Sequence, residues 1–153
     1  MLALVSIGAV SVILRTPAQP DPVAERSRLG QETGAPIYLS YGEEATGAKP
    51  IAEGETFHVG GLTIESFLTW GHSPGGTTFF IRGLDRPVAV VGDSLFAGSM
   101  GGGNVSYDDA LRNNREQILT LPDETIVFPG HGPLTPVGQE KRDNPFFAYN
   151  LDA

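Results

Sequence analysis

The chain has 153 residues, which is the length of one domain with a single hydrophobic core. Hydrophobic residues make up 40% and charged residues 18%, as in ordinary soluble globular proteins. The net charge of -8 and the pI of about 4.7 disfavour nucleic-acid binding, and the lack of cysteine excludes disulfides, cysteine–zinc sites and thiol nucleophiles. We therefore expect one domain over residues 1–153, a small-molecule substrate and no nucleic-acid partner.

The chain begins with an apolar run from Leu2 to Leu14, which has two interpretations. As the hydrophobic region of a secretory signal it has about the right length, but no Lys or Arg precedes it. As a buried strand, residues 9–14 are rich in Val and Ile and are followed by Arg15. We favour the strand, and with it a cytoplasmic protein. The run is too short to span a bilayer, so no membrane association is expected.

Glycine and proline cluster between the apolar runs, where they mark turns and loops. Gly34 is typical of a residue that ends a helix, Gly60-Gly61 of a two-residue hairpin turn, and Ser106 with Asp109 of a capping box that begins a helix. The predicted elements, in chain order, are a strand 9–14, a loop 16–22, a helix 23–33, a strand 37–40, a hairpin of strands 55–59 and 62–69, strands 77–82 and 88–91, a glycine-rich loop 94–105, a helix 107–119, a strand 125–128, a loop 129–133 and a helical segment from Val137.

This order of elements indicates an α/β architecture. Hairpins are mixed with helices, without strict alternation of strand and helix. The pattern fits sheets covered by helices better than a Rossmann-type parallel sheet. Neither a repeat nor a boundary between domains is visible in the sequence.

Two of the three histidines stand in similar loops. His72 lies in the segment WGHSPGG and His131 in FPGHGP, each directly after an apolar strand. Glycine lets the backbone turn sharply and approach a ligand closely, and loops at strand ends commonly carry functional side chains. For one such histidine a surface position without a role is the more common case, but the pair favours a site.

Asp93 completes a third segment of this kind, VVGDSL, directly after a buried strand. Alone it could be a helix N-cap or a turn residue. With His72 and His131 it forms a set of imidazole and carboxylate ligands that suits zinc, iron or manganese. The third histidine, His58, stands inside a predicted strand and is interpreted as a structural or surface residue.

Four motifs in this order resemble the metallo-β-lactamase superfamily, and within it the glyoxalase II-like (hydroxyacylglutathione hydrolase-like) branch. GHSPGGT at 71–77, GDSLF at 92–96 and PGHG at 129–132 resemble three loops of the family, and NPF at 144–146 resembles a segment of the glyoxalase II-like proteins. The resemblance covers about residues 13–147. It implies a metallo-β-lactamase-like αββα sandwich with a metal site at one edge.

The resemblance also assigns ligands, and here the chain departs from the family. The family motif THxHxDH falls where this sequence reads TPAQPDP, at 16–22. Its Thr and Asp match, but its three histidine positions hold Pro17, Gln19 and Pro22. Proline has no side-chain donor atom, and a neutral Gln is a poor zinc ligand.

In the family His72 would match a ligand of the first metal, His131 a ligand of the second, and Asp93 the carboxylate that bridges the two. Family members hold one or two zinc ions. We expect at most one here, zinc or alternatively iron, held by Asp21, Asp93 and His131 with Gln19 nearby. Asp21 followed by Pro22 is also a standard helix start, and the two interpretations of Asp21 stay open.

Three functions follow from these residues and the resemblance. The first is a metal-dependent hydrolase that cleaves a thioester, ester or lactone with metal-bound hydroxide, in which Asp21 orients or deprotonates the water. The second is a catalytically inactive or truncated relative with a scaffold or binding role. The third is a mononuclear iron dioxygenase of the same fold, which ranks last because that iron site needs the missing histidines.

The resemblance further implies a fold that is incomplete at the N-terminus, because family members usually have another strand region and helix before this point. Removing outer strands from a sheet would expose an apolar edge. We therefore expect marginal stability, or else a homo-oligomer or a missing N-terminal segment that completes the sheet.

Overall fold

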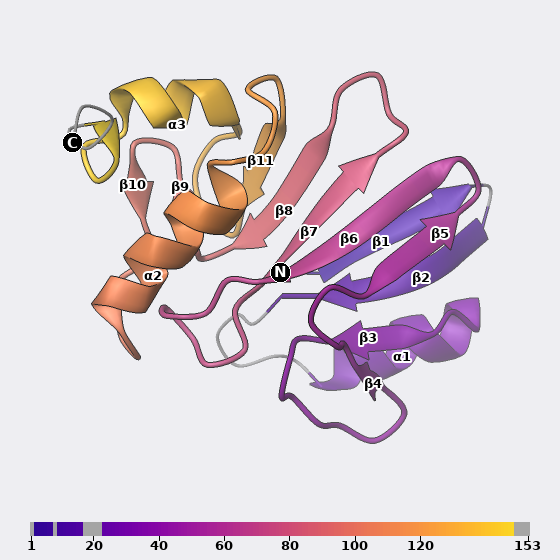
Figure 1. The fold of residues 1–153 in the computed structure, drawn as a ribbon. Coiled ribbons are helices and arrows are strands. Elements are labelled where there is room, and N and C mark those ends of the chain that lie inside the picture. The colour runs from indigo at the N-terminus through magenta and orange to yellow at the C-terminus, as the bar shows by residue number, and fades with distance from the viewer. Residues whose placement is uncertain (1, 8, 17–22, 149–153) are drawn as a thin grey trace.

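The computed structural model describes residues 2–7, 9–16 and 23–148, which form two stacked sheets with helices on both outer faces (Figure 1). Of the predicted loop 16–22 only Thr16 is described. Asp21, Pro17, Gln19 and Pro22 lie outside the described residues.

The first sheet has four strands in the order β1-β2-β3-β4. Its elements are β1 (Leu2–Ile7), β2 (Ala9–Arg15), α1 (Val23–Thr33), β3 (Ile37–Leu39) and β4 (Lys49–Pro50). The N-terminal apolar run thus folds as two antiparallel strands, while β3 pairs in parallel with β2 and with β4. The helix predicted over 23–33 is confirmed, and Gly34 follows it with a left-handed backbone.

The second sheet has six strands in the order β12-β11-β8-β7-β6-β5. Only β8 and β11 are parallel neighbours, and the other adjacent pairs are antiparallel. Residues 60 and 61 form the predicted hairpin turn. The bounds are β5 (Thr56–Val59), β6 (Leu62–Leu68), β7 (Thr77–Arg82), β8 (Val88–Gly92), β11 (Ile126–Pro129) and β12 (Thr135–Pro136).

Side-chain alternation along the strands divides the core into three layers. Ile13 of β2 packs with Ile37 and Leu39 beside α1, whereas its neighbour Leu14 packs between the two sheets with residues of β7 and β8. The odd residues of β7 point to the same inter-sheet layer, and Phe80 points to the helices on the far side. The αββα sandwich implied by the resemblance is confirmed.

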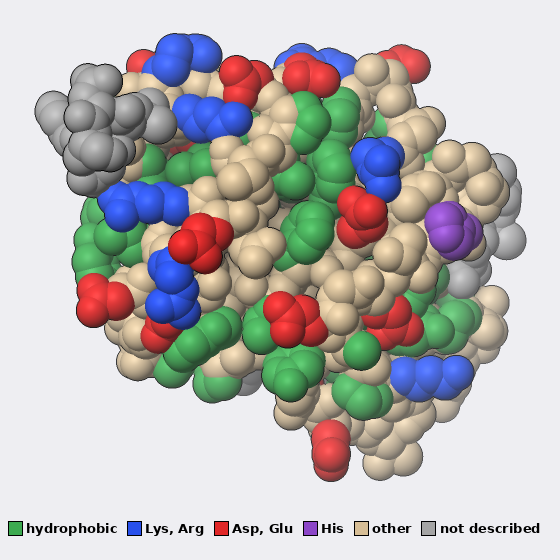
Figure 2. Space-filling view, in the orientation of Figure 1, with side chains coloured by type: hydrophobic (Ala, Val, Ile, Leu, Met, Phe, Trp, Pro, Cys, Tyr) green, Lys and Arg blue, Asp and Glu red, His purple; other side chains and the backbone are tan. Residues whose placement is uncertain are grey.

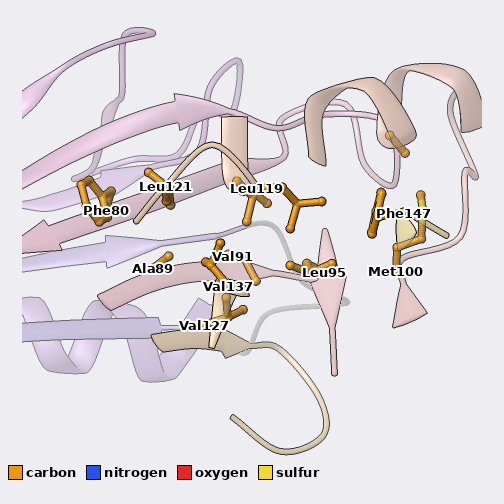
Figure 3. Close-up of a cluster of buried hydrophobic side chains, with 12 residues drawn as sticks. Phe80, Ala89, Val91, Leu95, Met100, Leu119, Leu121, Val127, Val137 and Phe147 are labelled. Atoms are coloured by element: carbon orange, nitrogen blue, oxygen red, sulfur yellow. The ribbon is translucent and has the colours of Figure 1, made fainter. Parts of the chain in front are cut away.

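The layer on the far side of the six-stranded sheet is the largest of the three clusters (Figure 3). Strands β8 and β11 contribute Ala89, Val91 and Val127, and α3 contributes Val137. Burying side chains of this size contributes roughly 1.5–3 kcal/mol each, so this layer is the main attachment of the helices to the sheet.

Two predicted segments differ from the structure. The glycine-rich loop 94–105 contains a small hairpin of β9 (Leu95–Phe96) and β10 (Ser99–Met100), because two-residue strands are too short to show a periodic pattern. The helix predicted over 107–119 divides into α2 (Tyr107–Asn113) and a π-helical turn, η1 (Asn114–Ile118). The two-residue strands β4 and β12 were also not predicted, because strands this short show no periodic pattern either.

The capping-box pattern ahead of α2 is confirmed in part. Ser106 is the N-cap, and its hydroxyl oxygen accepts from the Asp109 backbone N–H at 3.3 Å. The Asp109 carboxylate, however, accepts from the Ser106 hydroxyl at 2.6 Å, and the Ser106 N–H donates to the Gly71 carbonyl. The bond from the Ser106 N–H to the Gly71 carbonyl ties the start of α2 to the loop that carries His72.

The last helix, α3 (Val137–Asp143), begins where a helical segment was predicted. On the face shown in Figure 2, acidic and basic side chains are interspersed. Within the part of the chain that the structure describes, no helix has the length and apolar character needed to cross a membrane.

Candidate metal centre

The candidate centre lies where several strands end at one edge of the sandwich. Strands β8 and β11 are parallel. Strand β7 is antiparallel to both β6 and β8, so β6 runs in the same direction as β8 and all three strands end at the same edge. His72, Asp93 and His131 lie in the loops that follow these strands. Thr16, at the end of β2, packs against Gly92, so the four-stranded sheet reaches the same place.

Three of the four predicted metal ligands lie within the described residues, and both histidines face Asp93. His72 Nε2 lies 3.8 Å from Asp93 Oδ2, and His131 Nε2 lies 3.6 Å from Asp93 Oδ1. The two imidazoles therefore face opposite oxygens of one carboxylate. The Asp93 side chain is 10% exposed, and His131, at 79%, leaves the centre open to solvent.

His72 is oriented by its other ring nitrogen. The His72 Nδ1–H donates to the Gly102 carbonyl at 2.8 Å. Because a carbonyl oxygen only accepts, Nδ1 carries a proton, and Nε2 is the ring atom that faces Asp93. Metal-binding histidines commonly have such a second partner, which fixes both the tautomer and the ring.

Glycine is required beside the ligands because neighbouring loops pack too closely there to leave room for a Cβ. A Cβ at Gly130 would collide with Asp93 Oδ1, and the Gly130 N–H donates to the Gly92 carbonyl at 2.7 Å. Gly92 itself has a φ of +56°, a left-handed conformation that suits glycine. The loops after β8 and β11 are thus packed against one another through their backbones, which brings His131 beside Asp93.

A small pocket, open to solvent, adjoins the ligands. Thr16, Ser73 and Ser94 line it together with His72 and Asp93. The hydroxyl of Ser94 donates to the Thr69 carbonyl at 3.2 Å, which fixes the wall beside Asp93.

The donor set fits a metal in its chemistry but is incomplete within the described residues. One carboxylate flanked by two imidazoles suits zinc or iron. Across residues 2–7, 9–16 and 23–148, however, no three His, Asp or Glu side chains gather closely enough to hold an ion. His72 and His131 each pair with a different oxygen of Asp93, so each half of the centre offers two protein donors here.

His58 lies on β5 with an exposed side chain, as expected for a surface residue. Ser94, part of the GDSLF motif, was not predicted to line a pocket. The two buried asparagines that contact the ligand loops, Asn113 and Asn114, were not predicted as site residues either. Two adjacent asparagines inside a predicted helix were the only available sign, because asparagine is unfavourable in helix interiors.

Comparison with known proteins identifies the family. The sequence model described as the metallo-beta-lactamase superfamily matches residues 7–131. This chain belongs to the metallo-β-lactamase superfamily.

Its sequence relatives include proteins named as hydrolases. The probable metallo-hydrolase YqgX of Bacillus subtilis is 32% identical over 88% of this chain and 74% of that protein. The hydroxyacylglutathione hydrolase GloC of Haemophilus influenzae is 37% identical over 61% of this chain. The chain spans only 45% of the GloC sequence.

Solved structures confirm the fold. ETHE1 from Myxococcus xanthus superposes with a TM-score of 0.78 over 92% of this chain and 64% of that one; at 24% identity, this likeness shows the fold alone. The B3 metallo-β-lactamase BLEG-1 gives a TM-score of 0.74 at 28% identity, over 87% of this chain and 75% of that one. TTHA1623, solved in a di-iron-bound form, gives 0.68 at 27% identity over 88% of this chain and 76% of that one.

Proposed function

We propose that this protein is a metal-dependent hydrolase that cleaves a small thioester, ester or lactone at the edge formed by the loops after β6, β8 and β11. The observation that carries the proposal is the pairing of both oxygens of Asp93 with His72 and His131. Superfamily membership and the hydrolase names of the relatives support it.

The described residues support a division of roles. His72 presents Nε2 because its Nδ1–H is held by Gly102, and Asp93 offers one oxygen to each half of the centre. His131 is exposed and so stands on the side from which a substrate arrives. We assign the third protein ligand of the His131 half to Asp21, as the family resemblance implies.

A bound zinc or iron ion would supply a water of lowered pKa and a positive charge that polarises the substrate carbonyl. Asp21 would orient that water or accept its proton. The carbonyl carbon gains the water oxygen and loses a thiolate or an alkoxide, so the products are an acid and a thiol or alcohol. The name of GloC makes a hydroxyacyl thioester the first substrate to try.

The test is hydrolysis of thioester, ester and lactone substrates by the purified chain, with added Zn²⁺ or Fe²⁺ and with chelator. We expect turnover that the chelator removes and that Asp93→Ala abolishes. His58→Ala is the matched control, because it removes an exposed imidazole on β5, away from Asp93, and should keep full activity.

Unchanged turnover in Asp93→Ala would refute the assignment of this centre. A complete lack of metal-dependent turnover would favour the inactive relative with a scaffold or binding role. The three substituted histidine positions, Pro17, Gln19 and Pro22, make this the alternative that the assay must decide.

A further inference from the structure

Two adjacent asparagines contact the two loops that carry His72 and Asp93. Asn113 Nδ2 donates to the Trp70 carbonyl at 2.8 Å, two residues before His72. Asn114 Nδ2 donates to the Ser94 carbonyl at 2.9 Å, one residue after Asp93. The pair lies where α2 meets η1, so one short stretch of helix contacts both loops.

A regular helix would not favour these residues at these positions. Asn113 and Asn114 are 8% and 2% exposed, and asparagine competes for backbone hydrogen bonds in helix interiors. The Asn114 Oδ1 is buried without a hydrogen-bond partner among the described residues. The Asn114 Nδ2 donates to the Ala110 carbonyl at 3.0 Å as well as to Ser94, so the unsatisfied oxygen offsets only part of what these two bonds contribute to stability.

The π-helical turn accompanies this arrangement. The Leu119 N–H donates to the Asn114 carbonyl at 2.8 Å, a bond spanning five residues instead of four. Successive residues of an α-helix project about 100° apart, so neighbours do not ordinarily serve one face. Here the two amides reach different loops, and π-turns inside helices occur frequently at functional sites.

Helix α2 is also seated directly on the His72 loop. A Cβ at Gly71 would collide with the backbone of Ala110. The Gly71 carbonyl accepts from the N–H groups of Val105 and Ser106, both at 3.0 Å. A shift of α2 would therefore move the His72 loop, and the asparagine amides couple that loop to the loop of Asp93.

We propose that Asn113 and Asn114 are positioning residues that hold the His72 and Asp93 loops together, so that His72 Nε2 stays within 3.8 Å of Asp93 Oδ2. Their action on metal rests on the proposed function, whereas their action on the loops does not. The ligand atoms would then be arranged before any ion arrives, which lowers the cost of binding it. The contacts of such outer residues typically change metal affinity by about 10–100-fold.

The first test uses the metal-free protein and backbone amide hydrogen exchange. Asn113→Leu should speed exchange of Gly71 and Gly76 about fivefold or more, and Asn114→Leu should do the same for Ser94 and Gly101, with the rest of the chain unchanged. Unchanged exchange in both loops, or an equal increase over the whole chain, would overturn the proposal.

The second test separates positioning from stability. Asn114→Leu removes an unsatisfied buried acceptor together with the two hydrogen bonds that Asn114 Nδ2 donates, so the urea unfolding midpoint of the metal-free variant should change little. Its affinity for Zn²⁺, measured by calorimetry, should fall about 10–100-fold. Equal Zn²⁺ affinity in the variant and the natural chain would contradict the proposal.

Thr125→Val is the matched control, since Thr125 Oγ1 is the other buried side-chain atom that lacks a partner among the described residues, and the backbone of Thr125 bonds to Pro122 and Val137. It should leave both loop exchange and Zn²⁺ affinity unchanged. If Asn114→Leu does not fold, Asn113→Leu applies the same tests at the less buried position. If the natural chain binds neither Zn²⁺ nor Fe²⁺, the proposed function fails, and the exchange pattern still decides the positioning role.

Discussion

The two sheets contribute very differently to the candidate centre. The loops at the edge of the six-stranded sheet carry His72, Asp93 and His131, and hydrogen bonds with neighbouring backbone hold these loops. The segment after β2 of the four-stranded sheet carries Asp21 among prolines where the family pattern has histidines. In sequence, the loops of the six-stranded sheet keep the residue types of the family pattern, whereas the segment after β2 keeps only its Thr and Asp.

This difference between the two sheets suggests that the loops can fold without the metal. The contacts that shape the six-stranded side, such as the Gly130 N–H to the Gly92 carbonyl, join protein to protein and need no ion. We therefore expect His72, Asp93 and His131 to reach their places whether or not a metal is present. On the proposed function, the number of metal ions that the centre holds depends on the segment 17–22, and the following predictions test this division.

The largest effect is expected from restoring the missing ligands. The triple variant Pro17→His, Gln19→His and Pro22→His should raise metal content to about two equivalents and tighten Zn²⁺ binding by more than about 100-fold, because the His72 half would then have at least the three protein ligands usual for catalytic zinc and the His131 half would gain a fourth. Elemental analysis and calorimetry measure both. The gain should vanish when Asp93→Ala is added. A triple variant with the metal content and Zn²⁺ affinity of the natural chain would refute the contrast between the two sides of the centre.

The next effect concerns a buried carboxylate that fixes two loops of the six-stranded side. Glu140, 1% exposed, accepts from the Thr135 hydroxyl at 2.6 Å, the Gly98 N–H at 2.9 Å and Asn144 Nδ2 at 2.7 Å. Glu140→Ala should lower the free energy of unfolding by about 3 kcal/mol, because these buried donors lose their acceptor.

Urea unfolding measures the loss, which should be the same with and without chelator. The exposed Glu116→Ala on η1 serves as the control and should stay within about 0.5 kcal/mol. A loss for Glu140→Ala that appears only when metal is present would show that the loops depend on the ion.

A smaller stability effect with a larger effect on the site is expected at Gly130. Gly130→Ala places a methyl group against Asp93 Oδ1, so the carboxylate or the His131 loop must move. We expect a destabilisation of about 1–3 kcal/mol, together with loss of Zn²⁺ binding. Gly61→Ala, where a Cβ meets open space, should change neither quantity, and a Gly130→Ala protein that binds Zn²⁺ normally would refute the packing argument.

The smallest effect lies away from the centre, at the contact between Asp123 and Lys141. Lys141 Nζ donates to Asp123 Oδ1 at 2.6 Å, and this hydrogen bond and the lysine charge lower the pKa of Asp123. Because the folded pKa lies below the unfolded value of about 3.9, the contact stabilises the fold above that pH and is lost as pH falls through the folded pKa.

Asp123→Asn should therefore be slightly less stable than the natural chain at neutral pH, and the gap should close in acid. Thermal melts across this pH range measure it. A gap that widens in acid would show that the sign is wrong.

Much of the fold could be predicted from local pattern. The strand over 77–82, the turn glycines at 60–61 and the helix over 23–33 all match the structure, because these elements follow from the types of neighbouring residues. The hairpin β9–β10 and the strand β12 could not be predicted, because pairings of two residues depend on distant partners such as Glu140.

The candidate site divides in the same way. His72, Asp93 and His131 were predicted from their motifs, and the structure brings them together. Asn113 and Asn114 were missed because their role depends on where α2 lies against two loops about 20 and 40 residues earlier in the chain. A residue that acts through contacts in space has no local pattern to reveal it, apart from its poor fit to a helix.

The most direct test of the central claim is the metal content of the purified protein, grown with zinc and iron available and measured by elemental analysis. We predict about one equivalent per chain, lost in both His131→Ala and Asp93→Ala and kept in His58→Ala. Metal no higher than background in the natural chain would contradict the claim. The protein would then be a relative whose ligand loops fold without a metal to bind.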